Sequence, residues 1–215
     1  MTGHSSPGAP AKPARTRLAL ACLVVWLAAA ASAPALGIWL AIGGAAIGLG
    51  AAVFVLDRGA ARRSLRPSTR LALAGAGAGF VMAAATYLLY PVLARLSPVI
   101  AADTARLYAS FRTVPRPIAS AALLPVILGE ELVWRGVVQT ELARRCGPWR
   151  GVVLAALAYA LAHAPLGSPL LVLVALLCGM VWGGLRAASG SLVPSLLAHL
   201  LWDVVVFLWL PLDAR

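Results

Sequence analysis

Long apolar segments dominate the chain and constrain its fold more than any other feature. They cover most of the sequence between residues 18 and 210. A helix needs about 20 apolar residues to cross a bilayer, and only helices and closed barrels satisfy their backbone polar groups in lipid. The sequence therefore predicts an all-α, polytopic bundle of about seven transmembrane helices, with spans near Leu18–Ala33, Leu36–Leu56, Leu71–Leu93, Ile118–Leu142, Trp149–Ala164, Leu170–Leu185 and Leu192–Leu210.

The composition agrees with a membrane protein and excludes a soluble globule. Hydrophobic residues make up 61% of the chain and charged residues 12%, with a mean hydropathy of +0.90. Soluble domains usually carry about 25% charged residues. The net charge of +11 would suit a nucleic-acid-binding protein if the basic residues formed one patch. They lie instead between the apolar runs, which indicates membrane topology and no nucleic-acid partner.

The distribution of the basic residues also predicts the orientation. With the N-terminus on the cytoplasmic side, twelve basic residues fall on that side and five on the other. This imbalance agrees with the positive-inside rule. We therefore expect a multi-pass integral membrane protein with a cytoplasmic N-terminus, in permanent contact with the lipid bilayer.

Two segments differ from the spans. Residues 1–17 are rich in proline, alanine, glycine and serine and contain basic residues, which is typical of a disordered basic tail. Residues 100–112 mix apolar and charged side chains, and they predict a helix that lies along the membrane interface. The remainder, residues 18–210, is expected to form a single transmembrane domain.

The most informative polar residues are Glu130, Glu131 and Arg135, which lie inside the apolar run from Ile118 to Leu142. An ionisable side chain in the middle of a span costs roughly 2.5 kcal/mol or more, so each needs a partner or a function. Glu131 and Arg135 are four residues apart with the acid first, which favours an ion pair on one helix face. Glu130 is rotated from Glu131 by about 100° and is predicted to face a different group.

Three other ionisable side chains fall within apolar runs, namely His163, His199 and Asp203. His199 and Asp203 are four residues apart and therefore share one helix face. A carboxylate and an imidazole in a water-accessible pocket can activate water, and a second imidazole can donate a hydrogen bond to the oxyanion that forms on an attacked carbonyl. With the three residues of the fourth span, these side chains form a candidate site for peptide hydrolysis.

The motifs resemble those of the CPBP family, which contains CAAX prenyl endopeptidases and bacteriocin-processing proteins and consists of intramembrane glutamic proteases. The family's first motif, Glu-Glu-x-x-x-Arg, is matched by Glu130, Glu131 and Arg135. Its second motif, Phe-x-x-x-His, is matched by His163, with Tyr159 in place of phenylalanine as a mild departure. The resemblance covers about residues 118–210, which it identifies as the catalytic core.

The third motif, His-x-x-x-Asn or Asp, is matched by His199 and Asp203. The resemblance implies that Glu130 and His163 activate water and that His199, with the residue four later, binds the transition-state oxygen. Glu131 and Arg135 would support the site. Because Asp203 lacks the amide donor of asparagine, we expect it to orient His199 by accepting its other N–H. The implied substrate is a membrane-embedded or lipid-anchored peptide or protein, prenylated or with another hydrophobic tail, in a bacterial-type cytoplasmic membrane, and no cofactor is implied.

Other interpretations stay open at this point. The polar residues can be purely structural, in a membrane scaffold or immunity protein with the same fold, or they can form the proton relay of a transporter. A metal-dependent membrane protease is a further alternative, although the chain has no H-E-x-x-H helix and its cysteines have no CxxC spacing. Its potential ligands would be Glu130, His163, His199 and Asp203.

Overall fold

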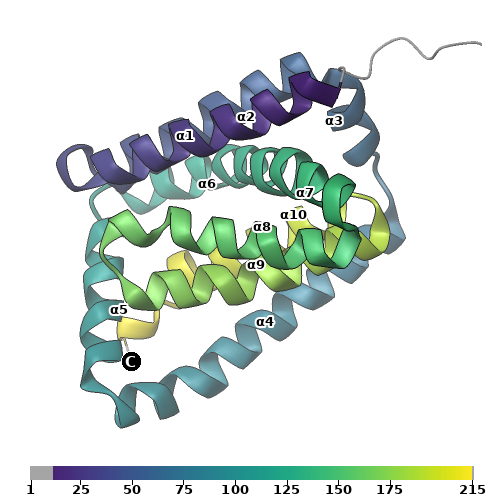
Figure 1. Cartoon of the computed structure of the whole chain (residues 1–215). Helices are drawn as coiled ribbons and strands as arrows, with labels where there is room; N and C mark the ends of the chain where they lie inside the picture. Colours follow the sequence, from purple (N-terminus) through teal and green to yellow (C-terminus); the bar gives the residue numbers. More distant parts are fainter. Residues whose placement is uncertain (1–11, 215) are drawn as a thin grey trace, which may run out of the picture.

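The computed structural model describes residues 12–214, and this part of the chain is helical throughout and contains no strand (Figure 1). The α-helices are joined by short turns, and the described residues include three π-helical segments, at Trp39–Gly43, Leu132–Val138 and Val204–Trp209. The α-helices are α1 (Lys12–Leu36), α2 (Gly44–Leu56), α3 (Arg58–Ser64), α4 (Thr69–Leu96), α5 (Pro98–Phe111), α6 (Arg116–Glu131), α7 (Gln139–Cys146), α8 (Pro148–Ala162), α9 (Pro169–Ser189) and α10 (Val193–Asp203).

The predicted bundle of transmembrane helices is confirmed. Within the described residues, six helical segments are long and apolar enough to cross a membrane, and the last apolar segment, Val193–Trp209, is slightly shorter. The protein is therefore an integral, multi-pass membrane protein. The six segments are Ala14–Leu36, Trp39–Leu56, Thr69–Leu96, Arg116–Cys146, Pro148–Leu166 and Pro169–Ser189.

The first helix begins earlier than the sequence suggested. Residues 1–11 of the predicted tail lie outside the described residues. Residues 12–17 are helical, so the predicted boundary between tail and helix lies too far along the chain. Two contacts explain this difference. Arg15 forms an ion pair with Asp57 at 2.7 Å, and the Thr16 hydroxyl donates a hydrogen bond to Glu141 at 2.6 Å. These contacts fasten the start of α1 to the junction between α2 and α3 and to α7.

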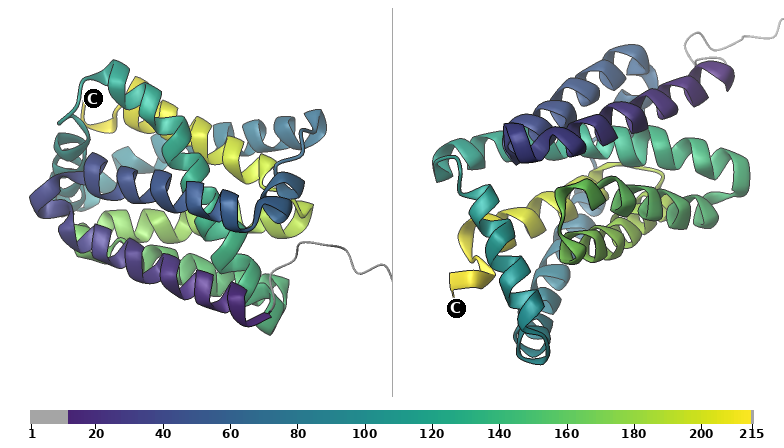
Figure 2. Two further views of the ribbon diagram at one scale, coloured as in Figure 1. Left: turned by 90° about the horizontal axis from the view of Figure 1, so that it is seen from above. Right: turned by 60° about the vertical axis from the view of Figure 1, so that its left-hand side comes forward.

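The helices form layers around α6 (Figures 1 and 2). The antiparallel pair α1 and α2 lies on one side of α6, and α8, α9 and α10 lie on the other side. Helix α4 crosses obliquely beneath α10, and α5 runs across one end of the bundle, roughly at right angles to its neighbours. The opposite end carries helix α3, the start of α1, the turn between α7 and α8, and the turn between α9 and α10. This is the end that holds the twelve basic residues assigned to the cytoplasmic side.

Glycines allow α2 and α6 to approach until their backbones touch. A Cβ atom on Gly129 would overlap the backbone of Ala46, and one on Gly50 would overlap the backbone of Gly129. Small residues at such crossings are a common packing device between helices in lipid. The crossing fixes α6 directly before the two glutamates.

Helix α5 forms where the sequence predicted an interfacial helix near residues 100–112. Its buried Asp103 accepts hydrogen bonds from the Ser168 hydroxyl at 2.7 Å and from the Leu170 N–H at 3.1 Å, and it forms an ion pair with Arg106. Burial alone would raise the pKa of Asp103, but these donors and the Arg106 charge hold it below its usual range. One carboxylate therefore fastens α5 to the start of α9.

Candidate active site

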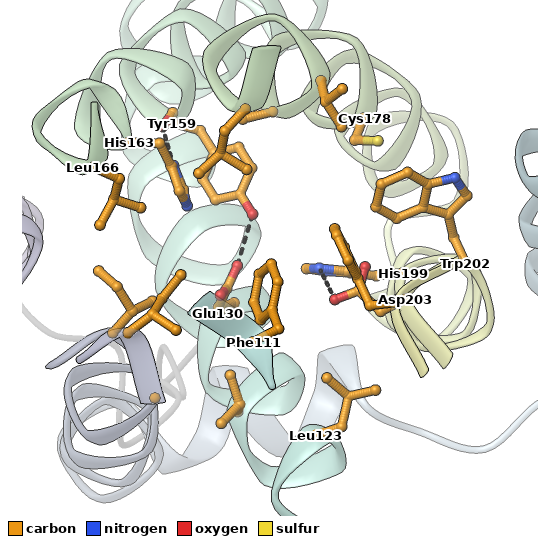
Figure 3. Close-up of a pocket in the computed structure, with 18 of the residues that line it drawn as sticks. Phe111, Leu123, Glu130, Tyr159, His163, Leu166, Cys178, His199, Trp202 and Asp203 are labelled. Carbon is orange, nitrogen blue, oxygen red and sulfur yellow. Dashed lines mark hydrogen bonds and ion pairs between the residues drawn. The ribbon is translucent and has the colours of Figure 1, made fainter. Parts of the chain in front are cut away.

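Three helices bring the predicted site residues together. Glu130 lies in the last turn of α6, His163 directly follows α8, and His199 and Asp203 lie on α10. All four line a cavity of about 100 Å³ between these helices (Figure 3). Its other walls are largely apolar and include Trp39, Phe111, Leu123, Val126, Tyr159, Leu171, Val174, Cys178, Trp182, Trp202 and Phe207.

Glu130 faces this cavity and is held by one hydrogen bond. The hydroxyl of Tyr159 donates to its Oε2 atom at 2.7 Å, and the two side chains point toward each other in Figure 3. Glu130 is 7% exposed, whereas its neighbour Glu131 is 0% exposed and does not line the cavity. The adjacent carboxylates therefore face different surroundings, as the rotation between consecutive helix residues predicted.

His163 is oriented by the backbone of the residue one turn earlier. Its Nδ1 atom lies 2.7 Å from the Tyr159 carbonyl oxygen. Because a carbonyl can only accept, Nδ1 carries the proton in this bond, and the neutral ring keeps the lone pair of Nε2 for the cavity. The ring also packs against the side chain of Tyr159, with 4.5 Å between the ring centroids.

Glu131 and Arg135 form the predicted ion pair, with Nη1 and Oε1 3.3 Å apart and both side chains almost fully buried. The guanidinium also lies over two aromatic rings, 4.7 Å from the Tyr159 centroid and 5.1 Å from the Trp182 centroid. Such stacking lowers the cost of burying the cation. The pair lies behind the cavity wall and supports the residues that line it.

His199 is held by Glu131 through a contact that crosses from α10 to α6. Its Nδ1 atom lies 3.0 Å from Glu131 Oε1, while its Nε2 atom is 3.7 Å from Asp203 Oδ2, too far for a direct hydrogen bond. The expectation that Asp203 orients the ring by accepting its N–H is therefore not met by a direct bond. Glu131 provides the acceptor instead.

Trp182 from α9 completes the surroundings of His199. The two rings are stacked, with 3.6 Å between their centroids and 17° between their planes. Stacking on one side and the bond to Glu131 restrict the imidazole to one orientation. Sequence analysis missed this tryptophan, which belongs to no motif; a large aromatic residue inside an apolar span is a weak signal for a site.

The four cavity residues do not converge on one point. In the described part of the chain, no three histidine, cysteine, aspartate or glutamate side chains are placed together as metal ligands. Glu130 and His163 lie on one side of the cavity, and His199 and Asp203 lie on the other (Figure 3). The arrangement can activate water on one side and bind a developing negative charge on the other.

One comparison with known proteins gave a match. Residues 113–205 match a family model described as type II CAAX prenyl endopeptidase Rce1-like. The match confirms the predicted resemblance over a segment that contains the cavity walls apart from residues 38–43, Phe111 and Phe207. No curated protein and no solved structure matches the chain.

Proposed function

Given that residues 113–205 match the Rce1-like CAAX prenyl endopeptidases, we propose that the chain is an intramembrane glutamic endopeptidase. It hydrolyses a peptide bond in a membrane-embedded or lipid-anchored substrate with water activated by Glu130 and His163. The observation that carries this proposal is the presence of a carboxylate and an imidazole from two different spans in the wall of one cavity. The catalytic core corresponds to residues 118–210 of a single transmembrane domain, residues 18–210.

The orientation of the two groups supports water activation. Glu130 Oε2 accepts the Tyr159 hydroxyl, which leaves Oε1 for water, and His163 presents the lone pair of Nε2. A water molecule that donates one hydrogen to each acceptor directs its own lone pair into the cavity. When this oxygen attacks the carbonyl carbon, Glu130 takes the proton as general base and can later pass it to the departing amine.

The other side of the cavity suits the oxyanion of the tetrahedral intermediate. His199 donates from Nδ1 to Glu131, so only Nε2 remains to bind the oxyanion, and this requires a proton on both nitrogens. The carboxylates of Glu131 and Asp203, at 3.0 and 3.7 Å from the ring nitrogens, balance that charge. A donor fixed before the reaction stabilises the developing charge without reorganisation. Arg135 and Glu131 act by holding His199.

A second cavity supports a substrate with a hydrophobic tail. It has a volume of about 260 Å³, lies between α4, α5, α9 and the segment after α10, and is almost entirely apolar. It shares wall residues with the polar cavity, so an apolar chain in one can continue into a peptide in the other. The shared residues are Leu171, Val174, Cys178, Trp202 and Phe207.

The placement of charges supports the predicted orientation, in what we propose is a bacterial-type cytoplasmic membrane. The end of the bundle that carries α3 and the turn between α7 and α8 holds the larger set of arginines and would face the cytoplasm. Helix α5 would then lie along the opposite interface. Labelling of single cysteines introduced into the α7–α8 turn and into α5 tests this orientation in intact cells.

The proposed function is tested with purified protein in proteoliposomes and a fluorescence-quenched peptide that ends in a prenylated CAAX sequence. Glu130→Gln and His163→Ala are each expected to lower kcat at least about 100-fold, because general acid–base groups contribute roughly 10²–10⁴-fold. Glu141→Gln is the matched control. Glu141 is a buried acid on α7, in the same membrane-crossing segment, and it bonds to Thr16, Arg144 and Arg145 outside the cavity.

Cleavage by Glu130→Gln at the wild-type rate would rule out the proposed mechanism. The unprenylated peptide, measured in parallel, determines whether the tail is recognised. Loss of activity in a chelator that is restored by added zinc would favour the metal-dependent alternative.

A comparison of membrane proteomes with and without the protein should reveal its natural substrate as an unprocessed precursor.

A further inference from the structure

The hydroxyl of Tyr159 touches a proposed reacting group in the wall of the cavity. Its Oη atom donates to Glu130 Oε2 at 2.7 Å, and the residue is 5% exposed. The family motif has phenylalanine at this position. The hydroxyl that contacts Glu130 is therefore the group that phenylalanine would lack. We propose that the Tyr159 hydroxyl is a positioning group for the general base Glu130, an inference that rests on the proposed function.

The hydroxyl can fix the carboxylate because the ring that carries it is itself held. The Tyr159 ring meets the Trp134 ring edge to face at 5.1 Å between centroids, and the Arg135 guanidinium lies over it at 4.7 Å. Both Trp134 and Arg135 are almost fully buried. A short hydrogen bond from such a fixed donor selects one rotamer of Glu130 and occupies one of its two oxygens. The second oxygen is left in the cavity for water.

Tyr159 also fixes the second group that would contact the water. Its carbonyl oxygen accepts from His163 Nδ1 at 2.7 Å, which turns Nε2 toward the cavity. One residue therefore sets the position of Glu130 through its side chain and the tautomer of His163 through its backbone. A substitution of tyrosine by phenylalanine removes the first contact and keeps the second. The change thus isolates the effect of positioning Glu130.

The expected effect of Tyr159→Phe is a lower kcat with an unchanged KM. Hydrogen bonds to charged groups contribute enough to change a rate by roughly 10- to 100-fold when they act at the reacting group. A structural role would lower the amount of folded protein and leave kcat per folded molecule unchanged. The prenylated peptide used above provides both constants, and thermal unfolding in the same detergent reports the stability of each variant.

Tyr87→Phe is the matched control. The Tyr87 hydroxyl donates to the Leu210 carbonyl at 2.6 Å, and Tyr87 does not line either of the two cavities described above. This variant also loses a tyrosine hydroxyl that bonds to a distant segment of the chain. It is expected to keep the wild-type kcat, whereas Tyr159→Phe is expected to lose activity. Equal kcat values for Tyr159→Phe and wild type, or a change in KM alone, would overturn the proposal.

A second measurement separates this proposal from the proposed function. Infrared difference spectra between wild type and Tyr159→Phe report the carboxylate stretch of any acid that loses a hydrogen bond. We expect a shifted carboxylate band that is absent when the same substitution is made in the Glu130→Gln background. If wild type cleaves no peptide, the proposed function fails, but the band still decides whether Tyr159 positions Glu130. An unchanged band refutes the positioning contact whatever the activity.

Discussion

Glu130 and Glu131 are neighbours in the sequence, but the structure surrounds them differently. Glu131 is completely buried, contacts Arg135 at 3.3 Å and accepts from His199 at 3.0 Å. Glu130 lines a cavity and is bonded to the Tyr159 hydroxyl at 2.7 Å. A buried acid with a cation and a second donor beside it is used for structure. An acid that keeps one oxygen free in a cavity is available for chemistry.

The difference follows from the cost of burying charge. Removing a carboxylate from water costs several kcal/mol, and only a well-placed partner offsets this cost. The partners of Glu131 come from its own helix and from α10, so the acid ties the two helices together. Glu130 has no cation at hydrogen-bond distance among the described residues, and contact with water in the cavity can compensate for its burial instead. Substitutions that disturb Glu131 should therefore lower the stability of the protein, whereas substitution of Glu130 should lower its activity.

The largest loss of stability is expected for Arg135→Ala. This change leaves Glu131 buried without its cation, and breaking a buried pair in this way costs about 3–5 kcal/mol. Thermal unfolding of the purified protein in detergent measures the loss. Arg145→Ala is the control, because Arg145 pairs with Glu141 at 2.8 Å but is about half exposed, and exposed pairs contribute little. If the two variants unfold at the same temperature, the buried pair of Glu131 and Arg135 stabilises the protein no more than an exposed pair does.

The sequence predicted the Glu131–Arg135 pair and the separation of Glu130 from it because both depend on the geometry of one helix. The pair forms although a π-helical turn begins at Leu132, a feature that no residue pattern indicated. The four cavity residues were also predicted, because they are ionisable side chains inside apolar runs, and the resemblance to known motifs then suggested their roles. Helical spacing alone relates residues of the same span and says nothing about which faces of two spans meet.

The contacts that sequence reasoning missed all join different helices. The bond between Glu131 and His199, the stacking of Trp182 on His199 and the bond from Tyr159 to Glu130 depend on how α6, α8, α9 and α10 are rotated against each other. These rotations result from packing over many apolar contacts. The replacement of phenylalanine by Tyr159 was visible in the sequence, but its significance depends on the distance between its hydroxyl and the carboxylate.

Asp103 extends the comparison to a buried acid outside the spans. It resembles Glu131 because it is buried and held by several donors, here Ser168, Leu170 and Arg106. Asp103→Ala is expected to lower the stability by about 1.5–3 kcal/mol, the usual contribution of hydrogen bonds to a charged group. Hydrogen exchange of the backbone amides of α5 should increase in this variant more than exchange in α6.

The pH dependence of the same contact has a defined direction. Because the pKa of folded Asp103 lies below its usual value, its contribution to stability is complete above the pKa of the unfolded chain, about 3.9, and is lost as the pH falls through the lower folded value. Exchange in α5 of wild type should therefore increase in acid. Exchange in the alanine variant should lack this increment, and an identical acid response in both proteins would show that other groups hold α5.

The smallest effect is expected for Asp213→Ala, which removes an ion pair at the surface. Two nitrogens of Arg112 bond to the two oxygens of Asp213 at 2.7 and 2.6 Å, an ideal geometry, but Arg112 is more than half exposed. Water and salt screen such a pair, so the loss should be at most about 1 kcal/mol and should disappear at high ionic strength. Unfolding in low and high salt measures both. A loss as large as that of Asp103→Ala would mean that burial does not determine which carboxylates hold this bundle together, because Asp213 has the better geometry and Asp103 the deeper position.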